Sequence, residues 1–196
     1  MEGALIALNG PRLAATFYER GFDVDALLLK CCAELRASGL RVGGTIQRAA
    51  GDRGQCASSV HVVDLSSGEA FDIWENRGVC ARGCRLDERG LVESESSILT
   101  SIAERVDLVV INRFARAESL GRGLIGCFIA AIEAGIPVLT AVRPPYIEAW
   151  ETFQDGLGQV LPAAADAIVG WACEESTSMR SIAAACLIAS DLNSPL

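Results

Sequence analysis

The stretch that most constrains the fold runs from Asp107 to Val142 and reads as strand, polar loop, helix and strand. Leu108–Ile111 is a continuous aliphatic run, which is typical of a strand buried on both faces of a sheet. A helix is predicted over Leu124–Glu133, because apolar residues recur along one side and a glycine and a proline follow its end. Pro137–Val142 is the next apolar run. This βαβ pattern predicts two parallel strands joined by a right-handed crossover.

The loop between these elements is the first candidate site. Ligands of open parallel sheets bind outside the carboxyl ends of the strands, and a helix N-terminus favours anions. A tetrahedral oxyanion needs several converging donors, which guanidinium groups and backbone N–H groups supply. We therefore predict an anion site here; the alternative is a solvated loop whose glycines only shape a turn. The predicted ligand-binding residues of this loop are Asn112, Arg113, Arg116, Glu118, Gly121, Arg122 and Gly123.

Within this loop, Glu118 is expected to orient one of the arginines. The alternative role is a solvated ion pair, which contributes at most ~1 kcal/mol to stability.

The ends of other elements contribute three more predicted site residues: Asn9, Arg48 and Arg85. Asn9 follows the predicted first strand, Ala4–Leu8, and Arg48 follows the predicted second strand, Arg41–Gln47. These two strands and the strand beginning at Leu108 are expected to be parallel neighbours. Their carboxyl ends would then open on one side of the sheet, where the predicted site residues meet.

The rest of the chain predicts a single α/β domain over residues 1–196, with residues 174–196 as a helical C-terminal extension. The predicted fold class is a three-layer domain with a mostly parallel sheet and an inserted antiparallel hairpin. No clear period is seen over Leu13–Phe22. The remaining predicted elements are a helix over Asp25–Ser38 capped by Asp23 or Asp25, hairpin strands at Ser59–Leu65 and Ala70–Trp74, a helix from Leu86 to Arg105, a helix over Tyr146–Gly156, a strand or turn at Leu157–Pro162, and helices at Ala163–Cys173 and Ser181–Ala189 separated by a polar break at Glu174–Ser178.

A strand–loop–helix opening is where a phosphate-binding P-loop would lie. That loop requires glycines and a Gly-Lys-Ser/Thr ending, because backbone N–H groups and the lysine hold the phosphates. The segment from Asn9 to Asp25 contains no lysine, and the first lysine is Lys30, inside the predicted helix. Phosphate binding of the ordinary Walker type is therefore not expected.

Charge and hydropathy narrow the classes of partner. The formal net charge is −8, which opposes a general affinity for nucleic acid, so an anion would have to be bound by local groups. No basic segment followed by a long apolar run opens the chain, and no run reaches the roughly 18 apolar residues of a membrane span. We expect a cytoplasmic protein that engages neither nucleic acid nor membrane.

Eight cysteines occur in the sequence, and in a cytosolic chain free thiols are expected rather than disulfides. Cys56, Cys80 and Cys84 lie in polar, glycine-rich surroundings and, with His61, are weak candidates for a metal site, because their spacing is looser than Cys-x₂-Cys. One-sided packing of a strand is the alternative for His61. Since His61 is the only histidine, a serine–histidine triad is not expected, and no catalytic residues are predicted.

Several segments together resemble a bacterial family called domain of unknown function 2478: GGTIQR, RGCRLD, INRFARAESLGRGL, AGIPVLTAV and AWETFQDGL. The resemblance covers about Ala4 to Trp171. Its strongest segment, Ile111–Leu124, looks like the family pattern Asn-Lys-Phe-Gly-Lys-x-Glu-x-x-Gly-Arg-Gly. Matching residues are Asn112, Phe114, Glu118, Gly121, Arg122 and Gly123, while Arg113 and Arg116 stand for the two lysines and Ala115 for a glycine.

The resemblance implies a nucleoside-triphosphatase-like fold and an association with molybdenum transport. More distantly, the order of elements is similar to small P-loop phosphatases of nucleoside triphosphates, in which the position of Asn112 would carry an acidic residue that helps to hold Mg²⁺. Asn112 cannot supply that charge. We therefore expect a non-catalytic protein that binds a small anion such as molybdate, or a nucleotide, and serves molybdenum handling. The alternatives are an atypical nucleoside-triphosphate hydrolase and an oligomeric interaction scaffold.

A homo-oligomer is the expected assembly. The segment Ala163–Ala189 is rich in alanine, isoleucine and leucine and has few charges to cover an outer face. A dimer using part of this segment, or the helix that carries Trp150 and Phe153, is the prediction.

Overall fold

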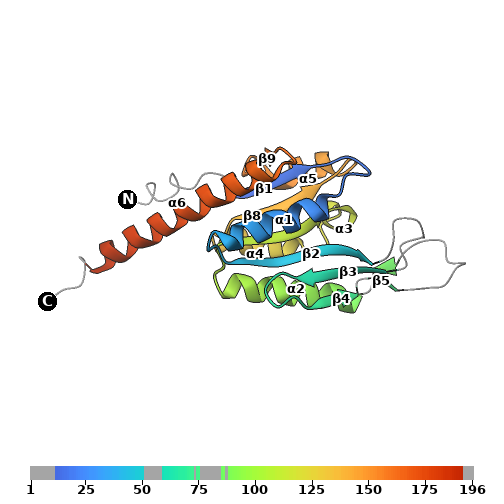
Figure 1. Ribbon diagram of the computed structural model, residues 1–196, viewed down its shortest axis with the longest axis horizontal. Helices are drawn as coiled ribbons and strands as arrows, with labels where there is room; N and C mark the ends of the chain where they lie inside the picture. Colours follow the sequence, from blue (N-terminus) through green and yellow to red (C-terminus); the bar gives the residue numbers. More distant parts are fainter. Residues whose placement is uncertain (1–11, 51–58, 73, 76–84, 87, 192–196) are drawn as a thin grey trace, which may run out of the picture.

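The computed structural model describes residues 12–50, 59–72, 74–75, 85–86 and 88–191. A seven-stranded sheet with the order β4-β3-β2-β7-β8-β1-β9 forms its centre (Figure 1). A separate antiparallel pair is formed by two short strands, β5 and β6. The strands are β1 (Leu13–Phe17), β2 (Val42–Ala50), β3 (Ser59–Asp64), β4 (Ala70–Asp72), β5 (Trp74–Glu75), β6 (Arg85–Leu86), β7 (Leu108–Phe114), β8 (Val138–Val142) and β9 (Gly158–Leu161).

Helices cover both faces of this sheet, which confirms the predicted three-layer α/β fold. Two helices, α1 and α6, pack with residues of one sheet face into one hydrophobic cluster, and α2, α4 and α5 pack on the other face. The helices are α1 (Val24–Ala37), α2 (Glu88–Ala103), α3 (Arg116–Ser119), α4 (Ile125–Glu133), α5 (Ile147–Gln154) and α6 (Ala165–Asp191).

The predicted βαβ unit is confirmed, since β7 and β8 are parallel neighbours joined through α4. Residues 108–111 and 138–142 are buried throughout, as expected for central strands covered on both faces. The strand β7 also pairs in parallel with β2. Gly44 permits this pairing to be close: its φ is +97°, and a Cβ there would lie 2.1 Å from the carbonyl oxygen of Val110. The inserted hairpin is confirmed as β3 and β4, which are antiparallel.

The first strand among the described residues is one that the sequence analysis did not predict. It is β1, Leu13–Phe17, in a segment that shows no clear period, and it lies between β8 and β9. Because Leu13, Ala14 and Ala15 are buried under helices on both faces, alternation between polar and apolar residues is absent. The predicted strand Ala4–Leu8 lies outside the described residues.

The predicted polar break in the C-terminal helix is also wrong, because α6 is continuous from Ala165 to Asp191. Polar side chains at the expected break form hydrogen bonds within the helix: the Ser176 and Thr177 hydroxyls donate to the carbonyl oxygens of Ala172 and Cys173, each at 2.8 Å. Figure 1 shows the far part of α6 extending beyond the layers of the sheet.

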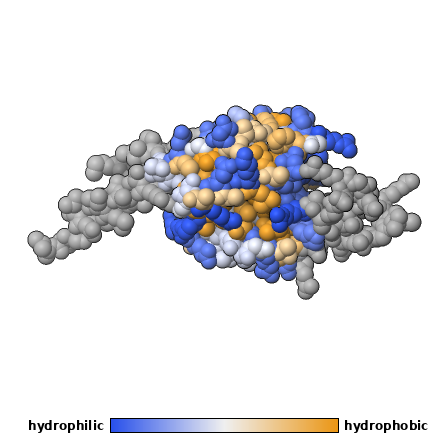
Figure 2. All heavy atoms as spheres, in the orientation of Figure 1, coloured by the Kyte–Doolittle hydropathy of each residue, from blue (hydrophilic) through white to orange (hydrophobic). Residues whose placement is uncertain are grey.

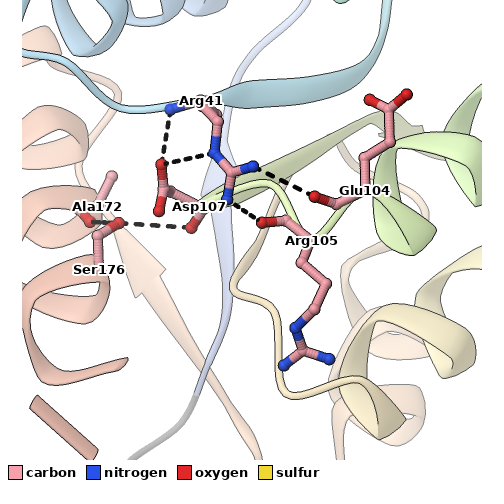
Figure 3. A network of polar contacts seen from close by, with 6 residues as sticks. All are labelled: Arg41, Glu104, Arg105, Asp107, Ala172 and Ser176. Carbon is pink, nitrogen blue, oxygen red and sulfur yellow. Dashed lines mark hydrogen bonds and ion pairs between the residues drawn. The ribbon is translucent and has the colours of Figure 1, made fainter. Parts of the chain in front are cut away.

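A polar network fixes α6 and the start of β7 at the amino-terminal edge of the sheet (Figure 3). The backbone N–H of Arg41 donates to the Asp107 carboxylate at 2.7 Å, and the Ser176 hydroxyl contacts the Asp107 carbonyl oxygen at 3.4 Å. The Arg41 guanidinium donates to the carbonyl oxygens of Glu104 and Arg105 at the end of α2. These contacts join the starts of β2 and β7, the end of α2 and the helix α6 on the side opposite the carboxyl ends of the parallel strands, so the network is structural.

The aromatic residues of α5 belong to the core. Trp150 is 1% exposed and packs edge-to-face on Phe114, with ring centroids 5.3 Å apart. Phe128 and Phe153 complete the same cluster. The Trp150 side chain is therefore occupied within the chain rather than free for a subunit contact.

The surface retains hydrophobic area. Figure 2 shows hydrophobic residues in the middle of the face in view, bordered by hydrophilic ones. Among the described helices, none combines the length and hydropathy that a membrane span requires.

Candidate functional site

At the carboxyl edge of the sheet, the connections that follow two neighbouring strands pass to opposite faces of the sheet. After β1 it passes into α1 on one face, and after β8 it passes into α5 on the other. Such a switch point is where open α/β sheets bind ligands. The two strand ends are tied together here, since the Tyr18 backbone N–H donates to the Val142 carbonyl oxygen at 3.1 Å.

Asp25, in the first turn of α1, joins this edge to β7. Its carboxylate accepts a hydrogen bond from the Asn112 amide nitrogen at 2.8 Å and another from an Arg113 guanidinium nitrogen at 2.6 Å. The Asp25 side chain is 18% exposed and that of Arg113 is 30% exposed. This partly buried, charge-assisted contact is shorter and stronger than an ordinary surface ion pair. Asp25, Asn112 and Arg113, with Tyr18, form what we call the Asp25 cluster.

Tyr18 supplies the aromatic part of the Asp25 cluster. The guanidinium carbon of Arg113 lies 5.6 Å from the centre of the Tyr18 ring, within the range of a cation–π contact. Burial raises the pKa of the Tyr18 hydroxyl above its usual value, although the positive charges of Arg113 and Arg143 act in the opposite direction. Tyr18 therefore stays neutral at physiological pH and keeps a proton to donate.

Several buried polar atoms of the Asp25 cluster have no hydrogen-bond partner among the described residues: the Tyr18 hydroxyl, the Asn112 amide oxygen and the Arg113 Nε. The Thr16 hydroxyl, one pleat back from Tyr18 on the same face of β1, shares this property. Since only an amide nitrogen can donate to the Asp25 carboxylate, the orientation of Asn112 is fixed and its oxygen faces elsewhere. Buried polar atoms are usually hydrogen-bonded, so these donors and acceptors require an explanation, and a bound ligand or water would supply one.

Glu118 has a different role from the one predicted. It is 8% exposed, and its two carboxylate oxygens accept hydrogen bonds from the backbone N–H groups of Ala115 and Leu124, each at 3.1 Å. It therefore holds the loop before α4 instead of orienting an arginine. Gly123 makes this possible, because its φ is +62° and a Cβ there would lie 2.2 Å from a Glu118 oxygen.

The loop amides are also less available than predicted. The N–H groups of Gly121 and Arg122 donate to the carbonyl oxygens of Glu118 and Ala117, and the Leu124 N–H is taken by the Glu118 carboxylate. An internal carboxylate thus already occupies the N-terminus of α4. An external anion near this loop would have to be bound mainly by side chains.

The arginines of the predicted site are not equivalent. Arg113 belongs to the Asp25 cluster, while Arg116 on α3 and Arg122 are exposed at the same carboxyl edge. Arg48 is exposed near the end of β2, opposite His61 in the register. Arg85 lies in β6, outside the main sheet. Asn9 lies outside the described residues.

The structure adds residues that the sequence analysis did not select: Tyr18, Asp25 and Arg143. Tyr18 follows β1, so it is missed when the first strand is placed at Ala4–Leu8. Asp25 is recognised only as a potential helix cap, a role that Asp23 fulfils by accepting from the Ala26 N–H at 3.1 Å. Arg143 directly follows a correctly predicted strand, and the rule applied to Asn112 should have selected it too.

The metal prediction falls on Cys56, Cys80 and Cys84, which lie outside the described residues. Within the part of the chain that the structure describes, no three His, Cys, Asp or Glu side chains lie close enough together to hold a metal ion. Cys31, Cys32, Cys127 and Cys173 are free thiols.

A shallow hollow of 460 Å³ runs along the outer side of α2, lined by Val92, Glu95, Leu99 and neighbouring residues. Its lining comes from α2 alone and contains no basic side chain. The Asp25 cluster therefore remains the better candidate site.

The comparisons with known proteins agree with this fold. A curated relative, the molybdenum import ATP-binding protein ModC 2 of Bradyrhizobium diazoefficiens, is 38% identical over 169 residues. The match covers 86% of this chain but only 19% of the relative, so the chain spans about one fifth of that protein's length.

A solved structure of a human cancer-related nucleoside triphosphatase matches with a TM-score of 0.56 at 15% identity. It covers 86% of this chain and 97% of the other, and it shows that the chain shares the α/β fold of that nucleoside triphosphatase. The model of the family described as protein of unknown function (DUF2478) matches residues 13–171. The chain therefore belongs to the DUF2478 family.

Proposed function

We propose that this protein is a non-catalytic binding protein for a small anion or a nucleotide and that it serves molybdenum handling. The observation that carries the proposal is the set of contacts that the Arg113 guanidinium makes. Its guanidinium is held in place by Asp25, while its Nε is buried without a partner among the described residues. A preorganised arginine with a spare donor is suited to an oxyanion, because little side-chain entropy is lost on binding.

The surrounding groups support the same chemistry. The Tyr18 hydroxyl is neutral and can donate, and the guanidinium of Arg143 is close enough to influence its pKa. Both residues directly follow the carboxyl ends of strands, where ligands of this class of fold bind. The exposed arginines Arg116 and Arg122 add positive charge on the same side of the sheet.

The absence of catalysis is proposed from the residue types. The segment between β1 and α1 contains no lysine, so the cation that neutralises phosphate oxygens in a P-loop is missing. Asn112, near the end of β7, has an amide side chain, which carries no charge for Mg²⁺. The molybdenum role is supported by the name of the relative, which is 38% identical to this chain over 169 aligned residues.

The experiment is a calorimetric titration of the full chain with molybdate, sulfate, phosphate and ATP. Arg113→Gln should weaken the binding of the ligand that wild type prefers by roughly 10- to 150-fold, the value of one charge-assisted hydrogen bond. Arg122→Ala should weaken it within the same range if the loop belongs to the site. Arg105→Gln is the matched control, since Arg105 is exposed at the opposite edge of the sheet, and its guanidinium is directed away from Arg41 (Figure 3).

Two results would contradict the proposal. One is that wild type binds none of the four probes at millimolar concentration. The other is that Arg113→Gln and Arg105→Gln bind the preferred probe equally well.

A further inference from the structure

Asp25 is placed where an external anion would be expected. It lies in the first turn of α1, directly after the loop that follows β1. In parallel α/β folds, this helix N-terminus is the position that attracts phosphate and other anions, because its N–H groups point outward and the helix dipole favours negative charge. Here two carboxylates of the chain itself lie at that helix end: Asp23 accepts from the Ala26 N–H as the N-cap, and Asp25 follows in the first turn.

Asp25 makes two of the contacts that a bound oxyanion would make, both with side chains of β7. One oxygen accepts from the Asn112 amide at 2.8 Å and the other from the Arg113 guanidinium at 2.6 Å. These partners are 87 and 88 residues away in sequence, so the carboxylate joins α1 to β7. An amide, a guanidinium and a helix N-terminus are also the donor set that a free oxyanion would use.

We propose that Asp25 is an internal competitor for the anion site, and that it decides how tightly the site binds an external oxyanion. This inference rests on the proposed function. A ligand that displaces the Asp25 carboxylate gains the Arg113 Nη group and the Asn112 amide nitrogen, in addition to the Arg113 Nε, which has no partner among the described residues. While the carboxylate remains, it neutralises Arg113 and repels a second anion.

The competing explanation is that Asp25 only ties α1 to the sheet. A purely structural contact would change stability without changing anion affinity. If Asp25 competes with the ligand, removal of the Asp25 charge should have opposite effects: it should lower the stability of the protein and raise its affinity for an oxyanion.

The test compares wild type with Asp25→Asn in titrations with molybdate, phosphate and sulfate. The substitution keeps the size of the side chain and removes its charge. The affinity of the variant for the best divalent oxyanion should rise by roughly tenfold or more, as expected for the removal of one nearby like charge. Asp166→Asn is the matched control, because Asp166 is exposed in the first turn of α6 and its loss changes the net charge equally.

The outcomes separate this inference from the proposed function. If both proteins bind with the same affinity, the inference is wrong and the proposed function stands. If neither binds any probe, both are wrong. An equal gain in Asp166→Asn would assign the effect to net charge and overturn the inference.

A measurement on wild type covers the case in which Asp25→Asn does not fold. The side-chain amide resonance of Asn112 should move on saturation with molybdate, because its acceptor changes from Asp25 to the ligand. A resonance that stays in place while molybdate binds would overturn the inference.

Discussion

Glu118 is the residue of the candidate site whose substitution should lower the stability of the protein most. The perturbation is Glu118→Ala, with Glu118→Gln as an intermediate step. In wild type the carboxylate accepts from the backbone N–H groups of Ala115 and Leu124, which lie on either side of the loop containing α3. Alanine removes both acceptors, whereas the single amide oxygen of glutamine can serve only one N–H group.

The magnitude follows from these two bonds. A hydrogen bond to a charged group contributes about 1.5–3 kcal/mol to stability, and a buried donor left unsatisfied costs a similar amount. Because water can reach part of this loop once Glu118 is gone, we take the lower value for each bond. Glu118→Ala should then lose about 3 kcal/mol and Glu118→Gln about half of that. For a chain of this length, the loss corresponds to a fall in Tm of roughly 6–12 °C for alanine.

The assay is urea unfolding followed by circular dichroism, with Tm as a second measure. Glu133→Gln is the control, since Glu133 is exposed at the end of α4 and should change stability by about 0.5 kcal/mol or less. A loss below about 1 kcal/mol for Glu118→Ala would refute the role assigned to the carboxylate. Equal losses for alanine and glutamine would refute the two-bond account.

Four further predictions concern catalysis, ionisation, thiols and assembly. Purified protein should show no Mg²⁺-dependent ATP or GTP turnover, and phosphate release at even ~0.1 per second, low on the usual enzyme scale, would contradict this. Because its pKa is raised, Tyr18 should bind its proton more tightly in the folded state, so its contribution to stability is complete below pH 10 and declines above it; Tyr18→Phe should reduce that decline in alkaline unfolding curves. Burial raises the pKa of three thiols, to about 11 for Cys31 and about 12 for Cys32 and Cys127. In native protein at pH 8, iodoacetamide should therefore leave these three thiols unmodified. In the denatured, unreduced chain, thiol titration should find all eight thiols free. Light scattering at micromolar concentration should give the mass of a homodimer, which we expect to use part of Ala163–Ala189. The mass of a monomer would refute this prediction.

Most of the fold is predictable because the strongest signals in the sequence are long apolar runs and helix periodicity. The segment Asp107–Val142 gives β7, α4 and β8 with errors of a few residues at the ends. The hairpin is predictable because its strands alternate around a Ser-Ser-Gly turn. By contrast, β1 is short, has only one β-branched residue in its Leu-Ala-Ala-Thr-Phe sequence, and shows no alternation of polar and apolar residues.

The site is harder to predict because its key contacts join distant residues. Nothing local in the sequence shows that Asp25 meets Arg113 across 88 positions, or that the Glu118 carboxylate bonds to backbone rather than to arginine. The same limit applies to the predicted break in α6. Serine and threonine oppose a helix by bonding locally to the backbone, but here their bonds are to carbonyl oxygens one turn earlier, which a helix accommodates.

The distribution of charge at the carboxyl edge bears on which ligand class fits. Glu19, Asp23 and Asp25 place three carboxylates in and beside the loop before α1, where a P-loop would surround a chain of phosphates. The positive groups lie instead near the end of β7, at Arg113, and directly after β8, at Arg143. A triphosphate extending along the N-terminus of α1 would meet those carboxylates, whereas a compact tetrahedral oxyanion needs only the arginine side of the edge and the displacement of one carboxylate. The residues of the described structure therefore favour a compact oxyanion over a nucleotide as the ligand of the proposed site.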